Sequence, residues 1–276
     1  MTEHGSGRVC LVIPYFNSPE GLMSALNSVQ LRETDLVIVV DDGSREVSAS
    51  GVAPIRVGPT PVMLVTLREN GGIAKALRAG VEAIPEGFRY VARLDCGDTC
   101  TMDRFEAQRQ FLDNDRGLVL IGSWVEFVDT TGRTLYRFDP PDSPRGVRNY
   151  MRLNCAVIHP TAMFRLDAYR EVGGYSDRYP AAEDYALFYD LSRLGDVRNI
   201  PQPLVRCLTN DGGISVRNRH VQIRSRIRIM ISHFDWTLTA VMGLVRAFLA
   251  LWLPRSMVSV LRGRWWRGRA RSGVAS

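Results

Sequence analysis

The chain has 276 residues, enough for one α/β domain of roughly 200–250 residues with an additional segment, and its 45% hydrophobic and 23% charged residues are ordinary globular values. The formal net charge of +6 is uneven, because the chain after Asp211 holds twelve arginines and one acid, a charge of +11, which leaves −5 for the rest. Five cysteines without a C-x-x-C pair argue against a zinc site and indicate a reducing compartment, and the polar residues 1–8 lead us to expect no signal peptide.

Apolar runs alternate with helical patterns over the first 125 residues. Ser18 and Thr101 stand at the starts of two helical patterns, where a hydroxyl group commonly caps the first turn. The expected strands are 9–13, 36–40, 62–67, 88–94 and 118–122, and the expected helices are 18–31, 71–84 and 101–114. This alternation predicts a mostly parallel sheet with helices on both faces.

Carboxylates follow two of these strands and recur once far downstream. Asp41-Asp42 comes after the second strand, Asp95 and Asp98 come after the fourth, and Glu183-Asp184 begins a later helix. In an open α/β sheet, ligands bind beyond the carboxyl ends of the strands. Any one acidic turn is also explained by solvation of a strand end, but three of them clustered together would repel one another. Together they favour a bound cation or a catalytic task.

The middle of the chain is less regular. A hairpin is expected over 125–138 around Gly132, followed by a loop at 139–144. Further on we expect a strand at 162–164, a turn at 173–175 and a helix over 182–194.

The basic end contains an apolar stretch at 236–253 whose only charge is Arg246. Its 18 residues lie at the lower limit for a membrane span. Arginines precede it, and tryptophans stand among arginines after it, as at a lipid headgroup layer. We therefore favour a helix that lies on an anionic membrane surface, with a single span and an ordinary packing helix as the alternatives. Nucleic-acid binding is disfavoured, because no nucleic-acid module is recognisable.

Seven segments of the chain form a recognisable series of motifs: 12–17 (VIPYFN), 41–44 (DDGS), 68–72 (RENGG), 93–98 (RLDCGD), 159–165 (HPTAMFR), 173–175 (GGY) and 183–185 (EDY). In these motifs and in their order the chain resembles the family 2 glycosyltransferases, enzymes of bacterial polysaccharide assembly with the GT-A fold. The resemblance covers about residues 8–215. The resemblance implies a Rossmann-like GT-A sheet and transfer of a sugar from a nucleotide donor to an acceptor hydroxyl, with inversion at the anomeric carbon.

The resemblance also implies where the donor binds. The donor-binding residues on the matching segments, or beside them, are Pro14, Tyr15, Asn17, Asp42, Asn70, Gly71, Lys75, Arg93 and Asp95. The first three would lie at the nucleotide base, and Asp42 would accept hydrogen bonds from the base or the ribose. Gly71 has no Cβ, so its backbone can approach the nucleotide closely. Lys75, the only lysine of the chain, is either a phosphate ligand or an exposed helical cation.

Asp95 and Asp98 occupy the family's metal-binding position. Carboxylate oxygens suit Mg²⁺ or Mn²⁺, and the bound cation would neutralise the departing diphosphate. Family members usually carry Asp-x-Asp-Asp, whereas this chain has Gly97 at the middle acidic position. We therefore expect Mg²⁺ or Mn²⁺ with reduced affinity.

The acidic pair at 183–184 matches the family's catalytic acids. Asp184 is the candidate general base that takes the proton of the acceptor hydroxyl, and an ordinary aspartate is ionised at neutral pH. Glu183 would orient it or contact the acceptor. The alternative is a solvated helix start, because acids suit the first helical turn. His159 has two interpretations as well, a wall of the acceptor pocket or a structural residue.

The resulting prediction is a GT-A domain over 1–215 and a basic, helical, membrane-associating segment over 216–276. The protein would lie on the cytoplasmic face of the cell membrane and extend a lipid-linked glycan. Two alternatives stay open. One is a non-catalytic nucleotide-sugar or saccharide-binding module, which Gly97 makes conceivable. The other is a nucleotidyltransferase, whose usual glycine-rich basic signature is missing after the first strand.

Overall fold

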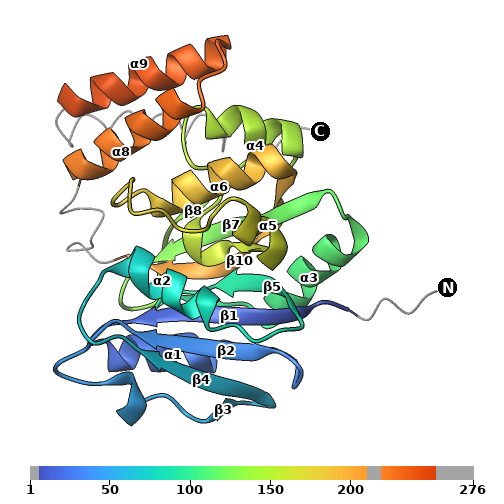
Figure 1. Ribbon diagram of the computed structural model, residues 1–276, viewed down its shortest axis with the longest axis vertical. Helices are drawn as coiled ribbons and strands as arrows, with labels where there is room; N and C mark the ends of the chain where they lie inside the picture. Colours follow the sequence, from blue (N-terminus) through green and yellow to red (C-terminus); the bar gives the residue numbers. More distant parts are fainter. Residues whose placement is uncertain (1–5, 210–218, 253–276) are drawn as a thin grey trace.

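The structure, a computed structural model, describes residues 6–209 and 219–252 and is built on one mixed sheet (Figure 1). In spatial order its strands are β3 (Arg56–Val57), β4 (Thr60–Thr66), β2 (Leu36–Asp41), β1 (Arg8–Tyr15), β5 (Phe88–Arg93), β9 (Met163–Arg165), β7 (Leu118–Val128), β10 (Asp196–Leu208) and β6 (Thr99–Cys100), with β8 (Thr134–Phe138) paired to β7. Neighbours among β4, β2, β1 and β5 are parallel, as are β7 and β10. Short β9 is antiparallel to both of its neighbours, so it joins two parallel blocks.

Helices cover both faces of the sheet, as the sequence predicts. Strand β1 alternates, with Cys10 and Val12 on one face and Leu11 and Ile13 on the other. The first face packs against α2 (Ile73–Glu82), α4 (Pro144–Met151), α5 (Leu166–Glu171) and α6 (Glu183–Leu194). The second face packs against α1 (Pro19–Asn27) and α3 (Arg104–Asn114). Two hydrophobic cores therefore lie above and below the sheet.

Three parts of the sheet and its surroundings differ from the sequence prediction. The stretch 118–128 is one continuous strand rather than a strand followed by half of a hairpin. Strand β10 was not predicted, because Pro201 and Pro203 are typical of a loop; the structure accommodates them at register shifts opposite β7. Helices α4 and α5 were also missed, since both are short and lie in an irregular part of the chain.

The two predicted helix caps are wrong in their chemistry. Ser18 is the residue before α1, but its side chain makes no capping hydrogen bond. Thr101 lies three residues before α3, and Asp103 is the residue at the helix start. The reason is that residues 99–100 pair with β10, and the Thr101 amide donates to Leu204 O at 3.0 Å. This pairing draws the segment into the sheet and moves the helix start onward.

Two further helices form one end of the molecule (Figure 1). Helix α8 (Arg219–Ser232) packs on α6, and its Ile223, Ile227 and Met230 belong to the same core as α2 and α6. Helix α9 (Leu238–Trp252) packs on α8. A Cβ on Gly243 would come within 2.0 Å of Arg152 O, so α9 also touches the end of α4 closely.

The predicted boundary between 215 and 216 falls in the undescribed range 210–218, and the arginine-tryptophan segment beyond 252 lies outside the described residues. Within 6–209 and 219–252, none of the helices combines the length and the apolar character that crossing a membrane requires.

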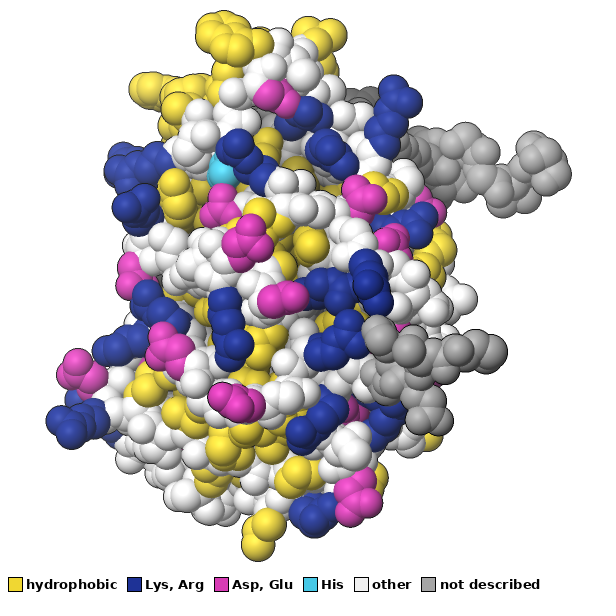
Figure 2. Space-filling model, turned by 45° about the vertical axis from the view of Figure 1, so that its right-hand side comes forward, with side chains coloured by type: hydrophobic (Ala, Val, Ile, Leu, Met, Phe, Trp, Pro, Cys, Tyr) yellow, Lys and Arg dark blue, Asp and Glu magenta, His cyan; other side chains and the backbone are white. Residues whose placement is uncertain are grey.

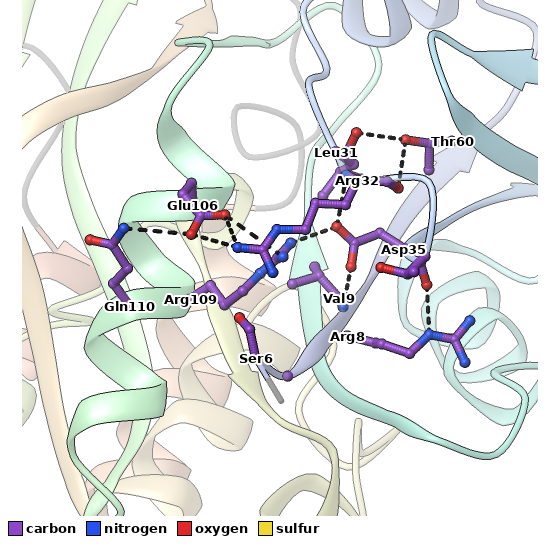
Figure 3. Close-up of polar contacts among 12 residues, drawn as sticks. Ser6, Arg8, Val9, Leu31, Arg32, Asp35, Thr60, Glu106, Arg109 and Gln110 are labelled. Atoms are coloured by element: carbon purple, nitrogen blue, oxygen red, sulfur yellow. Dashed lines mark hydrogen bonds and ion pairs between the residues drawn. The ribbon is translucent and has the colours of Figure 1, made fainter. Parts of the chain in front are cut away.

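A buried ion pair braces the sheet near the amino-terminal ends of β1 and β2 (Figure 3). Asp35 accepts hydrogen bonds from Arg109 Nη2 at 2.5 Å, Val9 N at 2.8 Å and Arg32 N at 2.9 Å. Both charged side chains of the pair are almost fully enclosed. The interaction ties α3 and β1 to the turn that enters β2.

Candidate active site

The loops after β1, β2 and β5 lie side by side at the carboxyl edge of the sheet. Tyr15 pairs with Asp41, and Asp42 N donates to Tyr15 O at 2.9 Å. On the other side of β1, Gly97 N donates to Gly21 O at 2.9 Å. The chain runs from β1 to β2 and β4 on one side, then returns to β5 on the other. Such a switch point is where an open α/β sheet leaves a ligand crevice.

The first loop is held by its own polar groups. Tyr15 is buried, and its hydroxyl donates to Val47 O at 2.6 Å. Asn17 adopts a left-handed φ of 45°, and its Oδ1 accepts from Glu46 N at 3.1 Å. Pro14 is partly exposed, and its carbonyl accepts from Cys96 Sγ at 3.2 Å. Tyr15 and Asn17 therefore shape the loop after β2, and of these two only Asn17 retains some exposed surface.

The acids after β2 hold neighbouring loops in place. Asp41 is buried; burial alone would raise its pKa, but hydrogen bonds from Ala49, Ser44 and Ser48 outweigh it and lower the pKa of this carboxyl. The Asp42 oxygens accept from Gly71 N at 2.8 Å and Gly72 N at 2.9 Å. The sequence predicts that Asp42 accepts hydrogen bonds from the nucleotide. In the structure Asp42 is only 5% exposed, and its carboxylate anchors the loop at 70–72.

Gly43 explains how these two loops come so close. Its φ is 68°, and a Cβ on it would lie 2.5 Å from the Glu69 carbonyl carbon, so only glycine fits. Beyond this contact Lys75 is exposed and borders a pocket of about 550 Å³ with Gly71 and Arg78. The far side of this pocket is Asp177, which pairs with Arg78 at 2.7 Å.

The two acids after β5 have different surroundings. Asp95 has a side chain that is 32% exposed, and its Oδ1 meets Arg93 Nη2 at 2.5 Å. Asp98 is buried, and its Oδ1 accepts from Leu208 N at 2.9 Å. Burial and the negative charge of Asp95 raise the pKa of Asp98 to about 7. The loop thus presents Asp95 outward and turns Asp98 toward β10.

Arg93, predicted to bind the donor, has no exposed side-chain surface. It bonds to Asp95, so its role is to hold that carboxylate rather than to meet a ligand. Gly97 has a φ of 93°, a conformation that an aspartate adopts only with strain. A Cβ there would also lie 3.3 Å from the Leu208 side chain. The backbone of the loop therefore accounts for a glycine at the middle acidic position.

The residues fit a divalent cation that takes most of its ligands from substrate. Among the described residues, no three His, Cys, Asp or Glu side chains are grouped to hold a metal ion by themselves. Mg²⁺ and Mn²⁺ sites of nucleotide enzymes use one or two carboxylates together with phosphate oxygens and water. Asp95 supplies one outward carboxylate. Burial and, after it, the charge of Asp95 raise the pKa of neighbouring Asp98, and a bound cation would offset the second of these two effects.

The acidic pair from the second half of the chain reaches this loop. Glu183 and Asp184 form the first turn of α6, where acids are favourable. Burial and the charge of Asp184 raise the pKa of Glu183 to about 7. Burial also raises the pKa of Asp184, and the charge of Asp95 adds to this effect. The structure thus brings the two acidic groups within electrostatic range of each other.

Two residues near the acids, Arg226 and Tyr175, were not assigned from the sequence, and for a third, His159, the sequence left open a wall of the acceptor pocket or a structural role. Arg226 of α8 lies near enough to Asp184 to lower its pKa, against the effect of burial. His159 and Tyr175 form a buried contact behind Arg93, at 2.9 Å between His159 Nε2 and the Tyr175 hydroxyl. The basic pattern of α8 gave no sign of which arginine points inward, and the buried partners of His159 come from distant segments.

Comparisons with known proteins agree with this geometry. The family model described as glycosyl transferase family 2 matches residues 10–173. The chain is 30% identical over 215 residues to the amylovoran biosynthesis glycosyltransferase AmsE of Erwinia amylovora, covering 76% of this chain and 79% of that protein. It is 27% identical over 208 residues to an Escherichia coli UDP-Gal:alpha-D-GlcNAc-diphosphoundecaprenol beta-1,3-galactosyltransferase, covering 71% and 72%.

Two solved structures share the fold. TarS 1–349 of S. aureus, in complex with UDP-GlcNAc, has a TM-score of 0.66 at 15% identity and covers 88% of this chain and 70% of its own. The mannosyltransferase PcManGT of Pyrobaculum calidifontis, in complex with GDP-Man and Mn²⁺, has a TM-score of 0.59 at 18% identity and covers 95% and 81%.

Proposed function

The chain belongs to glycosyltransferase family 2, and on that basis we propose that it is an inverting enzyme that moves a sugar from a nucleotide-diphosphate sugar to a hydroxyl of a lipid-linked glycan during cell-surface polysaccharide synthesis. The observation that carries the proposal is that Glu183 and Asp184, from the second half of the chain, lie within electrostatic range of Asp95 at the carboxyl edge of the sheet. A catalytic acid–base group and a donor-binding carboxylate must stand close together for such a transfer.

The donor is proposed to lie over the switch point between β1 and β5. Relatives with this fold were solved with UDP-GlcNAc and with GDP-Man and Mn²⁺. Exposed Lys75 and the outward carboxylate of Asp95 flank the loops on either side. We therefore assign the diphosphate to the space between Asp95 and the loop at 70–72. A divalent cation bound there by Asp95 supplies Lewis-acid stabilisation of the departing diphosphate.

Asp184 is assigned as the general base. As the acceptor oxygen attacks the anomeric carbon, the bond from that carbon to the diphosphate oxygen breaks and the acceptor proton passes to the Asp184 carboxylate. Attack on the face opposite the leaving group inverts the anomeric carbon. Asp184 is mostly buried, so its carboxylate is poorly solvated, and a base with a raised pKa accepts a proton more readily. Glu183, at the same helix start, is assigned to orient the acceptor.

A lipid-linked acceptor and a membrane surface are proposed together. The E. coli relative's name specifies a diphosphoundecaprenol-linked acceptor. In this chain, α9 leaves a row of large apolar side chains uncovered, and they project at one end of the molecule (top of Figure 2). We refer to this row as the α9 stripe, and it consists of Leu238, Val241, Met242, Val245, Phe248, Leu249 and Trp252. Exposed Arg224, Arg228 and Arg246 accompany it, which suits anionic lipid headgroups.

The test is transfer or hydrolysis with a panel of UDP-, GDP- and dTDP-sugars and Mn²⁺, comparing wild type with Asp184→Asn. We expect the variant to lose at least about 100-fold in turnover while it still binds the donor, because only proton transfer is removed. Asp167→Asn is the matched control, since Asp167 is also in the first turn of a helix but is exposed and remote from Asp95.

The outcomes also separate the alternatives. Donor binding without turnover in either protein would favour a binding module. Formation of a nucleoside triphosphate and a sugar 1-phosphate when inorganic diphosphate is added to the donor sugar, in place of a nucleoside diphosphate, would identify a nucleotidyltransferase.

A further inference from the structure

Behind the donor loop, three buried side chains from distant segments meet in a line: Tyr175, His159 and Arg93. We propose that this Tyr175–His159–Arg93 chain is a positioning device that fixes the Asp95 carboxylate for the metal and the donor diphosphate. The identity of the ligand in this proposal rests on the proposed function. The positioning role itself rests on the geometry of the three side chains.

Arg93 is fixed on three sides. Its Nη2 donates to Asp95 Oδ1 at 2.5 Å, its Nε donates to His159 Nε2 at 3.2 Å, and its Nη1 points to Val12 O at 3.4 Å. A guanidinium is a flat fork, so contacts at Nε and Nη1 determine where Nη2 lies. The position of the Asp95 carboxylate therefore depends on a partner at Nε.

His159 can serve only as an acceptor at this contact. Arginine has no acceptor atom, so Nε2 must carry the lone pair and the ring proton must be on Nδ1. Burial and the charge of Arg93 hold the pKa of His159 well below its ordinary value, which keeps the ring neutral. A protonated ring would place two cations in contact in a buried site, so the neutral form is the one that orients Arg93.

Tyr175 completes the arrangement. The Tyr175 hydroxyl lies 2.9 Å from the same Nε2, so it shares the one lone pair of that nitrogen with Arg93 Nε and holds the ring in place. Tyr175 is 1% exposed, and its own amide donates to the Tyr169 hydroxyl at 3.3 Å. Gly174 permits this packing, since a Cβ there would lie 2.6 Å from the Tyr169 ring. The Gly-Gly-Tyr turn thus places the Tyr175 hydroxyl against His159, on the inner side of the proposed donor site.

The reason that such a device matters here lies in Asp98. Asp98 is committed to Leu208 N and is 7% exposed, so Asp95 is the outward acid of this loop. When only one carboxylate binds a cation, the affinity depends more strongly on the fixed position of that carboxylate than when two carboxylates bind it together. Side chains that orient a metal ligand commonly affect metal affinity by 10- to 100-fold.

The experiment uses the full chain and four variants. His159→Leu removes the acceptor, His159→Gln keeps an acceptor oxygen near the position of Nε2, and Tyr175→Phe removes the donor hydroxyl. Phe188→Leu is the structural control, because the Phe188 ring packs edge-on against His159 at 5.8 Å without joining the hydrogen bonds. The dissociation constants for Mn²⁺ alone, and for UDP, GDP and dTDP with Mn²⁺, are measured by calorimetry on folded protein.

We expect His159→Leu to weaken Mn²⁺ binding by roughly 10- to 100-fold, Tyr175→Phe to weaken it less, and His159→Gln to restore most of it. Phe188→Leu should lower thermal stability but leave the Mn²⁺ constant within about twofold. Equal Mn²⁺ binding in wild type and His159→Leu, or no Mn²⁺ binding by wild type, would overturn the positioning role. If His159→Leu does not fold, the Tyr175→Phe constant decides the question: weaker Mn²⁺ binding than wild type supports the positioning role, and equal binding overturns it.

The proposed function is judged by a different arm. Wild type that binds Mn²⁺ but none of the three nucleotides contradicts the proposed donor, while a selective loss of Mn²⁺ affinity in His159→Leu still supports the device.

Discussion

Glu183 has the carboxyl whose titration is easiest to test. Its pKa rises from an ordinary 4.5 to about 7, because the group is buried and lies beside the charge of Asp184. The unfolded chain ionises Glu183 near its ordinary value. Between about pH 4.5 and 7 the folded protein therefore holds a proton that the unfolded chain has lost.

It follows that this group stabilises the fold fully below about pH 4.5 and that the contribution disappears as the pH rises through 7. Glu183→Gln cannot titrate. We expect the melting temperature of wild type to fall relative to the variant between pH 5 and pH 8, as measured by thermal unfolding in matched buffers. A difference that stays constant over this range would contradict the raised pKa.

Arg226 offers a second test at the residue scale. Its positive charge lowers the pKa of Asp184, against the effect of burial. Arg226→Gln should therefore raise that pKa and move the acid limb of the pH–rate profile to higher pH, by up to about one unit. Arg224→Gln is the control, because Arg224 is on the same helix but exposed. Equal shifts in both variants would show a general charge effect rather than contact with the base.

At the scale of elements, α9 combines two unlike faces. Ala240, Gly243 and Ala247 are buried against the body, whereas Leu238 and Trp252 are 75% and 87% exposed. The buried side holds small residues, so the helix lies close to α4 and α8. The outward face carries the apolar side chains of the α9 stripe beside exposed Arg246, and exposed apolar surface of this kind marks interaction sites.

We expect acidic substitutions in the α9 stripe to release the protein from lipid. Val245→Glu with Leu249→Glu should weaken binding to phosphatidylglycerol vesicles by at least about tenfold, since it removes apolar contact and adds repulsion. Both positions are about half exposed, so the fold should be unaffected. Ile55→Glu is the control, because Ile55 is 86% exposed but lies in the loop before β3. Co-sedimentation measures the outcome, and unchanged binding of the double variant would exclude this face.

At the scale of the whole molecule, the proposed site and the buried brace lie at opposite edges of the sheet. The carboxyl edge carries the acids at 95–98 and 183–184, while the opposite edge is braced by the buried pair of Asp35 and Arg109 (Figure 3). Asp35 also accepts two backbone amides, so its loss leaves a buried cation and two donors without their acceptor.

Asp35→Ala should therefore destabilise the protein by about 3–5 kcal/mol, measured by urea unfolding. Because the edge is remote from the donor loops, the nucleotide dissociation constant of the folded variant should match wild type. Glu33→Ala is the control: Glu33 pairs with Arg56 at 3.5 Å on the surface, and its loss should cost about 0–1 kcal/mol. A small effect of Asp35→Ala would show that the brace is not needed.

Much of the first half could be predicted from the sequence. Strands such as β2, with six consecutive buried residues, leave a clear apolar run between turn signals. The second half was harder because its signals conflict. Strand β10 contains two prolines and forms no recognisable pattern, whereas β9, a strand of only three residues, was expected at 162–164 and lies one residue further on. Their places are set by pairing with β7, which is far away in the chain.

The sequence by itself determined the sheet with helices on both faces, the family and the positions of the acids, because strand and turn chemistry is local and each motif is contiguous. Only the tertiary structure decided how each acid is placed and which groups surround it. Asp98 turns inward because β10 offers an amide, and Arg93 is enclosed because His159 and Asp95 meet it. Asp184 comes within electrostatic range of Asp95 because α6 begins near the carboxyl edge of the sheet. Burial and partners come from packing between distant segments, and they set the charge and the orientation on which the chemistry depends.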